Sequence, residues 1–188
     1  MEEALVLAAA DGNVHKVVQL LSLGARVDMR YQGYTPLLAA ADRGQTEVCQ
    51  LLLEAGSDLE ETEPFTMSTA LNKVASQDNQ SLLKLLLSNK ANFNSSSING
   101  FTPLHMASQE GHLASVVTLL QAGADQLLPK HDGFLPIHQA AQHNHVEVVR
   151  ILIEQGGCSP DQVRHTALQS LDHLSGERVN YQRHHQIL

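Results

Sequence analysis

Apolar residues along the chain recur at spacings of three and four, and the whole pattern returns after roughly 33 residues. The clearest copies begin at Gly33, Gly100 and Gly133, and fainter copies begin at Glu3 and Ser68. Within each copy the spacing predicts two short helices, each with one apolar stripe, separated by a turn. The chain is therefore expected to form a row of stacked helix pairs, in which each pair packs on its neighbours.

Four columns of equivalent positions are expected to supply the core. The first helix of each copy carries a bulky column followed three residues later by a small one, which lets neighbouring backbones approach closely. The second helix carries two aliphatic columns that form the other wall. The columns are Leu5, Leu37, Leu71, Leu104 and Ile137; Ala8, Ala40, Val74, Ala107 and Ala140; Val17, Cys49, Leu83, Val116 and Val149; and Leu20, Leu52, Leu86, Leu119 and Leu152.

Helix boundaries follow from threonine, proline and glycine. Thr35-Pro36 and Thr102-Pro103 place an N-cap and a first-turn proline at the start of a helix. Asp78 and Asn144 stand where other copies have a turn glycine, and both types tolerate a left-handed backbone. The remaining glycines predict the inter-helix turn (Gly12, Gly44, Gly111), the end of the second helix (Gly24, Gly56, Gly123, Gly156) and a hairpin-like turn before the next copy (Gly33, Gly100, Gly133).

These residues resemble the ankyrin-repeat family. Its T-P-L-H signature is complete at Thr102-Pro103-Leu104-His105 and partial at residues 35–38 and 135–138. The resemblance implies an all-α solenoid of stacked helix–turn–helix units with β-hairpin finger loops. Repeats at about 3–32, 33–66, 67–99, 100–132 and 133–157 would form one domain, 1–157. Residues 158–188, with a decayed copy from His165, would form a degenerate sixth repeat or C-terminal cap and tail.

The resemblance also implies non-catalytic protein binding on a concave face, as an adaptor, scaffold or inhibitor. Three rings follow the finger glycines, and they either anchor a partner or support their own finger. Polar residues at the helix ends would form a rim, or are ordinary solvated positions. The predicted partner-binding residues are Tyr31, Tyr34, Asp42, Arg43, Phe65, Gln77, Ile98, Phe101, Gln109, Glu110, His131, Phe134, Gln142 and His143. Asn94, eight residues after Leu86, resembles the site that asparaginyl hydroxylases modify in such fingers.

The copy at Ser68 departs from the pattern. It lacks the proline, the histidine and both loop glycines, and carries Asn72 in the histidine position. The loop before it holds Asp58, Glu60, Glu61 and Glu63, whose like charges make an ordered hairpin doubtful without a basic partner. The loop is interpreted either as solvated or as a contact site.

Composition limits the other functions. The 188 residues carry a net charge of −8, which disfavours nucleic acid and anionic membranes, and no stretch is apolar enough to span a bilayer. Two cysteines and the acidic start at Met1 predict an intracellular protein, cytoplasmic or nuclear. Cys49 should be buried and inert.

No catalytic, phosphate-binding or metal motif is present in the sequence, so no cofactor is expected. His105 and His138 are expected to bond the backbone, and His143 and His145 to point to different sides of a turn. A metal protein or enzyme using the His-rich C-terminal half, where His184-His185 lie, is one alternative. A self-associating module with Leu127-Leu128 exposed is another, although we expect a monomer.

Overall fold

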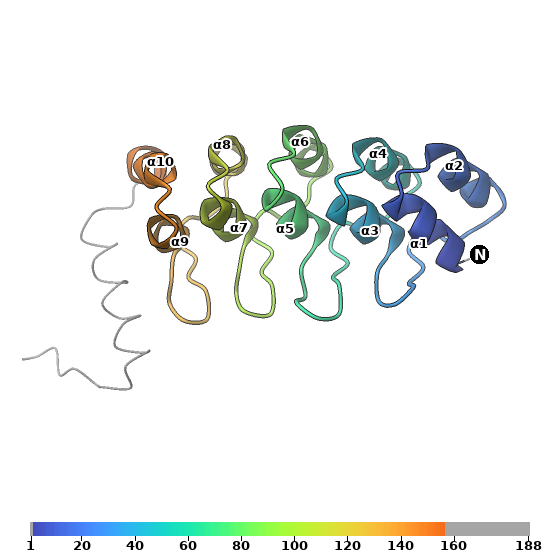
Figure 1. The fold of residues 1–188 in the computed structure, drawn as a ribbon, viewed down its shortest axis with the longest axis horizontal. Helices are drawn as coiled ribbons and strands as arrows, with labels where there is room; N and C mark the ends of the chain where they lie inside the picture. The colour runs from blue at the N-terminus through green and yellow to red at the C-terminus, as the bar shows by residue number, and fades with distance from the viewer. Residues whose placement is uncertain (1, 157–188) are drawn as a thin grey trace, which may run out of the picture.

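Two parallel rows of short helices make up the molecule (Figure 1). The computed structural model describes residues 2–156. The predicted cap at 158–188, with Cys158, the copy from His165 and His184-His185, lies outside them. One row holds α1 (Glu2–Ala10), α3 (Pro36–Asp42), α5 (Ala70–Ala75), α7 (Pro103–Glu110) and α9 (Pro136–Gln142). The other holds α2 (Val14–Ser22), α4 (Thr46–Glu54), α6 (Gln80–Ser88), α8 (Leu113–Ala122) and α10 (Val146–Gly156). The all-α repeat architecture is thus confirmed.

The odd-numbered helices begin at the predicted caps. Thr35 Oγ1 accepts a hydrogen bond from Leu38 N (3.2 Å), and Thr102 Oγ1 accepts one from His105 N (3.4 Å). In the divergent copy, Thr69 Oγ1 accepts from Asn72 N (3.4 Å) while Asn72 Oδ1 accepts from Thr69 N (3.1 Å). This reciprocal pair is a capping box, so the start of α5 is capped although it lacks the proline of α7.

The predicted columns form a continuous apolar layer between the two rows. Both columns of the odd-numbered helices are buried at every repeat, and Cys49, Leu83 and Val116 are buried in the even-numbered row. Only Leu20 and Val149, in the first and last described repeats, are half-buried among the predicted core positions. Each helix pair therefore buries its apolar residues against its neighbours rather than around a single centre.

The turns between paired helices keep their left-handed residue in every described copy. Asp78 (φ 55°) and Asn144 (φ 60°) adopt the conformation that Gly12, Gly44 and Gly111 adopt elsewhere. The substitution of glycine by Asp or Asn leaves the turn intact, as the sequence predicts.

The loops between repeats project beyond the odd-numbered row without forming paired strands (Figure 1). Tyr31 and Tyr34 form a β-bridge with two N–O distances of 3.0 Å around Gln32 and Gly33, both with positive φ. Within residues 2–156 this is the one β-bridge, and no longer ladder forms. The hairpin prediction thus holds for the turn geometry but not for extended pairing.

Candidate functional site

The predicted binding residues lie on one surface, which we call the inner face. It consists of the inter-repeat loops (23–35, 57–69, 91–102 and 124–135) and the C-terminal ends of α3, α5, α7 and α9 (Figure 1). At the helix ends, Asp42, Arg43, Glu110, Gln142 and His143 are exposed, whereas Gln77 and Gln109 are half-buried. The sequence therefore predicts correctly that these helix ends are polar and reachable by solvent.

The three loop rings are half-buried, and the two phenylalanines pack against their own repeats. Phe101 and Phe134 meet the imidazoles of His105 and His138 edge-on, at centroid distances of 6.0 and 5.5 Å. Both contacts join residues four positions apart, where a loop enters its helix. Local support of the loops is thus one role of these rings, and their exposed parts remain open to a partner.

Two lysines that the sequence analysis overlooked cover these rings. Lys130 Nζ lies 4.2 Å from the Phe101 centroid and 3.0 Å from Asp132 Oδ2, and Lys73 Nζ lies 5.5 Å from the Tyr34 centroid. Burial raises the pKa of Asp132, but hydrogen bonds and the Lys130 charge outweigh burial and lower it. Lys73 occupies the same column as Ala39, Met106 and Gln139, and the mixed composition of that column is the signal that marks it as variable surface.

A second row of predicted residues follows the loop tips. Phe65 is 77% exposed and Ile98 54% exposed, and His131 is also exposed. Tyr31 is half-buried and donates its hydroxyl to Glu3 Oε1 (3.0 Å), an interaction that raises the tyrosine pKa. Backbone bonds join adjacent tips, from Ile98 N to Thr66 O (2.7 Å) and from His131 N to Asn99 O (3.3 Å). The tips therefore form one connected edge with two exposed apolar side chains.

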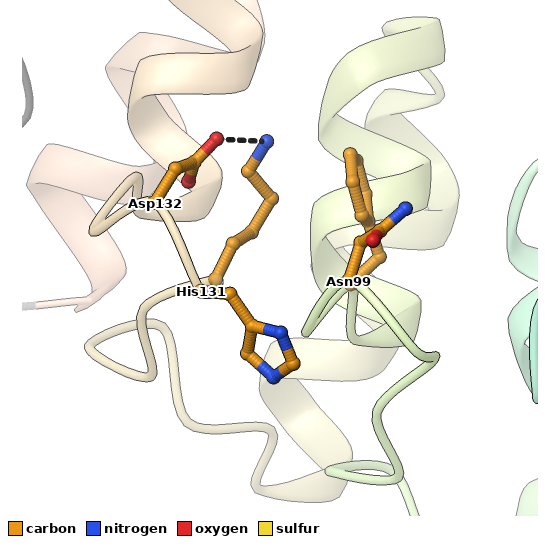
Figure 2. A pocket seen from close by; sticks show the side chains of 5 residues that line it. Asn99, His131 and Asp132 are labelled. Atoms are coloured by element: carbon orange, nitrogen blue, oxygen red, sulfur yellow. Dashed lines mark ion pairs between the residues drawn. The ribbon is translucent and has the colours of Figure 1, made fainter. Parts of the chain in front are cut away.

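Two shallow hollows lie next to each other on the inner face and share Asn99 and Phe101. One, of about 270 Å³, is lined in addition by Lys130, His131 and Asp132 (Figure 2). The other, of about 230 Å³, is lined in addition by Thr66, Ser68, Ser97, Met106 and Gln109. The first hollow contains an ion pair, and no charged side chain lines the second.

The histidine of the T-P-L-H signature has a structural role, as predicted. His105 is fully buried; its Nδ1 accepts from Thr102 N (3.3 Å), and its Nε2 donates to Phe134 O (3.0 Å). Burial lowers the pKa of His105 to about 4, which keeps it neutral. His138 Nδ1 likewise accepts from Leu135 N (2.9 Å). These imidazoles complete backbone hydrogen bonds at helix starts rather than converging on a metal.

The prediction for His143 and His145 is wrong. Their rings lie nearly parallel, at 7°, with centroids 6.3 Å apart, because the left-handed Asn144 between them folds the turn back. His143 Nδ1 bonds Gln139 O (3.0 Å) and His145 Nε2 bonds Gln109 O (2.9 Å). Within residues 2–156 no three His, Cys, Asp or Glu side chains converge as metal ligands would.

The acidic loop is ordered, and its basic partner is in the chain itself. Arg30 of the preceding loop pairs with Glu61 and donates to Thr62 O (3.0 Å) and Gly33 O (2.8 Å). Glu63 is buried and accepts from Phe65 N (3.1 Å), from Thr66 N (2.6 Å) and from the Thr66 hydroxyl. Burial raises the Glu63 pKa, but these hydrogen bonds outweigh it and lower the pKa. The interpretation of the whole loop as solvated is therefore wrong for Glu61 and Glu63.

Two single residues complete the predicted sites. Cys49 is buried, and burial raises its pKa to about 12, so the thiol is inert as expected. Asn94 is half-buried in the loop after α6, where its Oδ1 accepts from Asp125 N (2.9 Å); it stays a predicted modification site. Among the helices of the described range, none has the length and apolar character needed to cross a bilayer.

Comparison with known proteins gives matches along most of the chain. A family model for ankyrin repeats in three copies matches residues 1–63 and 60–130, and a single ankyrin-repeat model matches 132–165. A Caenorhabditis elegans ankyrin repeat and KH domain-containing protein, mask-1, is 34% identical over 124 residues, which are 65% of this chain and 5% of that protein.

Two further relatives show the same partial coverage. The mouse B-cell lymphoma 3 protein homolog is 32% identical over 123 residues, 65% of this chain and 25% of the relative. Bovine mitochondrial disaggregase is 34% identical over 132 residues, 67% of this chain and 19% of the relative. The chain thus matches a quarter or less of the length of these three relatives.

Proposed function

Because the chain belongs to the ankyrin-repeat family, whose repeats generally mediate protein–protein interaction, we propose that its inner face binds a protein partner. In this role the chain acts as a non-catalytic adaptor, scaffold or inhibitor. Neither nucleic acid nor a membrane is proposed as a ligand, and no cofactor is needed. We place the protein in the cytoplasm or nucleus as a monomer.

The observation that carries this proposal is the pair of exposed apolar side chains at adjacent loop tips. Phe65 is 77% and Ile98 54% exposed, and the backbone bond from Ile98 N to Thr66 O (2.7 Å) holds the two loops together. Isolated exposed apolar residues need no explanation, but neighbouring ones beside half-exposed rings are typical of a contact surface. Such side chains would be the centre of the interface, with the polar helix ends as its rim.

Hydrogen bonds between successive repeats hold this face in one shape. The residue just before α4, α6, α8 and α10 reaches a carbonyl at the end of the first helix of the preceding repeat or in the turn that follows it. These bonds are Gln45 Nε2 to Ala10 O (3.3 Å), Asn79 Nδ2 to Gly44 O (3.2 Å), His112 Nε2 to Ser76 O (3.1 Å) and His145 Nε2 to Gln109 O (2.9 Å). A preorganised face loses little conformational entropy on binding, which favours affinity.

A catalytic function has less support. One relative is named a disaggregase, but the aligned segment is 19% of its length, and the name describes that whole protein. The cysteine within the described range, Cys49, is buried with a pKa of about 12, so it is not a nucleophile. The geometry described above supports recognition rather than chemistry.

Partner capture with matched variants tests the proposal. Phe65→Ala combined with Ile98→Ala removes the exposed apolar pair without touching a buried ring. We expect capture to fall at least tenfold, as is usual for hot-spot truncation. Val18→Ala combined with Val146→Ala is the control, because these residues are also exposed (47% and 66%) but lie in the even-numbered row. Equal capture by the two double variants would exclude the inner face as the binding surface.

Self-association is the second candidate because Leu127 is 42% exposed beside a hollow of about 220 Å³ that Leu120 and Ala124 also line. Light scattering of the full chain distinguishes the two functions. A dimer that becomes a monomer on Leu127→Ser would favour self-association, whereas a wild-type monomer at high concentration would exclude it.

A further inference from the structure

One member is missing from the row of rings on the inner face. The column that holds Tyr34, Phe101 and Phe134 holds Ser68 in the third repeat. Each ring fills the base of its own loop, and a serine side chain cannot fill the same space. The hollow of about 230 Å³ lies at this position, with Ser68 in its lining.

We propose that this hollow, which we call the Ser68 pocket, binds a tyrosine side chain of the protein partner, which supplies the ring that the repeat lacks. The inference rests on the proposed function, because the tyrosine belongs to a segment that lies along the inner face. Its basis is the size of the Ser68 pocket, the chemistry of its walls and the absence of charge among its lining residues.

The size suits one aromatic side chain. An enclosed apolar cavity of roughly 150 Å³ is enough to bind benzene. The Ser68 pocket, at about 230 Å³, therefore has room for a six-membered ring and a polar substituent. Because the pocket opens to the surface, a side chain can enter it without any loop moving.

One wall is apolar and the other carries hydroxyl and amide groups. Phe101 and Met106, both half-buried, present a ring and a thioether, and thioether–aromatic contacts are favourable. In the same lining, Ser97 Oγ accepts from Phe101 N (3.2 Å), so its own proton stays available to a ligand. The exposed Asn99 bonds His131 through its carbonyl, and Figure 2 shows its side-chain amide pointing away from His131 and Asp132. A phenol matches both walls, since its ring is apolar and its hydroxyl both donates and accepts.

The charge distribution disfavours charged side chains. Lysine, arginine or a carboxylate would lose water in the Ser68 pocket without meeting an opposite charge, because none of its lining residues is charged. The neighbouring hollow differs, since Lys130 and Asp132 pair there at 3.0 Å (Figure 2). Thr66 and Ser68 already bond each other (2.7 Å), but a purely apolar side chain would leave the Ser97 hydroxyl proton without a partner. Tyrosine is the side chain that satisfies every wall.

The first experiment uses 4-methylphenol as a tyrosine side-chain probe in an NMR titration of the full chain. We expect millimolar binding that shifts the amide signals of Ser68, Ser97 and Phe101. Ser68→Phe should weaken it at least tenfold by filling the pocket from inside, as Phe101 and Phe134 fill theirs. Ser81→Phe, at an exposed position of α6, should bind like wild type. Should Ser68→Phe fail to fold, Met106→Ala removes the thioether from the apolar wall and should also weaken binding of the probe.

The second experiment selects binders from a random dodecapeptide library displayed on phage. We expect one position enriched in tyrosine, and at least tenfold weaker binding of the selected peptides to Ser68→Phe than to Ser81→Phe. Toluene binding as tightly as 4-methylphenol, shifts away from the pocket, or peptides without tyrosine would each overturn the assignment. If Phe65→Ala/Ile98→Ala abolishes partner capture while Ser68→Phe does not, the proposed function stands and the tyrosine pocket fails.

Discussion

A buried histidine and a buried asparagine perform the same task in successive repeats. His105 accepts a backbone N–H at the start of α7 and donates to Phe134 O (3.0 Å). Asn72 accepts from Thr69 N (3.1 Å) at the start of α5 and donates through Nδ2 to Phe101 O (3.2 Å). An amide and an imidazole can both offer one acceptor and one donor about a ring's width apart. The chain thus contains its own uncharged substitute for the signature histidine.

This equivalence gives a prediction about pH. The folded-state pKa of His105 is about 4, below the unfolded value of about 6.5, so below pH 6.5 the unfolded state binds a proton that the folded state does not. Stability should therefore fall as the pH falls from 6.5 towards 4. His105→Asn cannot titrate, so it should lose about 2 kcal/mol less than wild type between pH 7 and pH 5. Urea unfolding at both pH values measures this difference.

His15→Asn is the control. It makes the same histidine-to-asparagine substitution at an exposed position of α2, outside the core. Its loss of stability between the two pH values should equal that of wild type. A similar equality for His105→Asn would show that the buried imidazole does not govern the acid sensitivity.

At the scale of elements, the loops are held by side chains from the neighbouring loops. Arg30 bonds to Gly33 O in its own loop and to Thr62 O in the next, and also pairs with Glu61. Backbone N–H groups continue the connection, from Asp58 N to Asp28 Oδ1 (3.1 Å), from Asn92 N to Glu60 Oε1 (2.9 Å) and from Asp125 N to Asn94 Oδ1 (2.9 Å). The acidic side chains of the second loop are thus part of a chain of inter-loop bonds.

Arg30→Ala should loosen the loop at 57–69 while the helices remain. The expected loss of stability is about 1 kcal/mol, because the ion pair is partly exposed although the carbonyl bonds add to it. Hydrogen exchange should accelerate at Glu63 N and Met67 N, which bond Ser68 O and Glu63 O within this loop. Arg26→Ala, at an exposed position of the preceding loop, should leave these rates unchanged. Unchanged exchange in Arg30→Ala would mean that Glu63 alone orders the loop.

The helices could be predicted because their signals are local. Apolar spacing, Thr–Pro caps and left-handed turn residues all act within a few positions of one another, and Leu71, Val74 and Asp78 keep that spacing even in the divergent copy. Periodicity alone was therefore enough to find α5, although its proline and histidine are absent.

The contacts of the candidate site could be predicted only in part, because they join residues about one repeat apart. Lys73 reaches Asp42 (3.0 Å) across 31 positions, and Arg30 reaches Glu61 across the same separation. Sequence spacing shows that Asp42 and Tyr34 lie on a variable surface. It does not show that the ammonium group of Lys73 contacts both of them. The Ser68 pocket could not be predicted for the same reason. Its lining comes from two neighbouring loops and α7, so only the folded structure shows that the missing ring leaves a hollow.

At the scale of the whole molecule, each repeat depends on those beside it. In such a stack, stability is approximately the sum of weak intrinsic terms and interfaces between neighbours. Helix α5 packs between α3 and α7, whereas α1 begins the described stack and has α3 as its neighbour in the same row. Removal of the same core side chain should therefore destabilise more helices when it is in the middle of the stack than when it is at the end.

Leu71→Ala and Leu5→Ala test this dependence, because both remove a fully buried leucine from the same column. Each should cost about 2–5 kcal/mol locally. In native-state hydrogen exchange, Leu71→Ala should lower protection in α3, α5 and α7 together, whereas Leu5→Ala should lower it chiefly in α1 and α2. Coupling through the interfaces predicts this asymmetry, because an end repeat can open without breaking the stack and a central repeat cannot. If protection falls only in α5 and α6 for Leu71→Ala, the repeats are independent units, and the inner face is not held rigid by its neighbours.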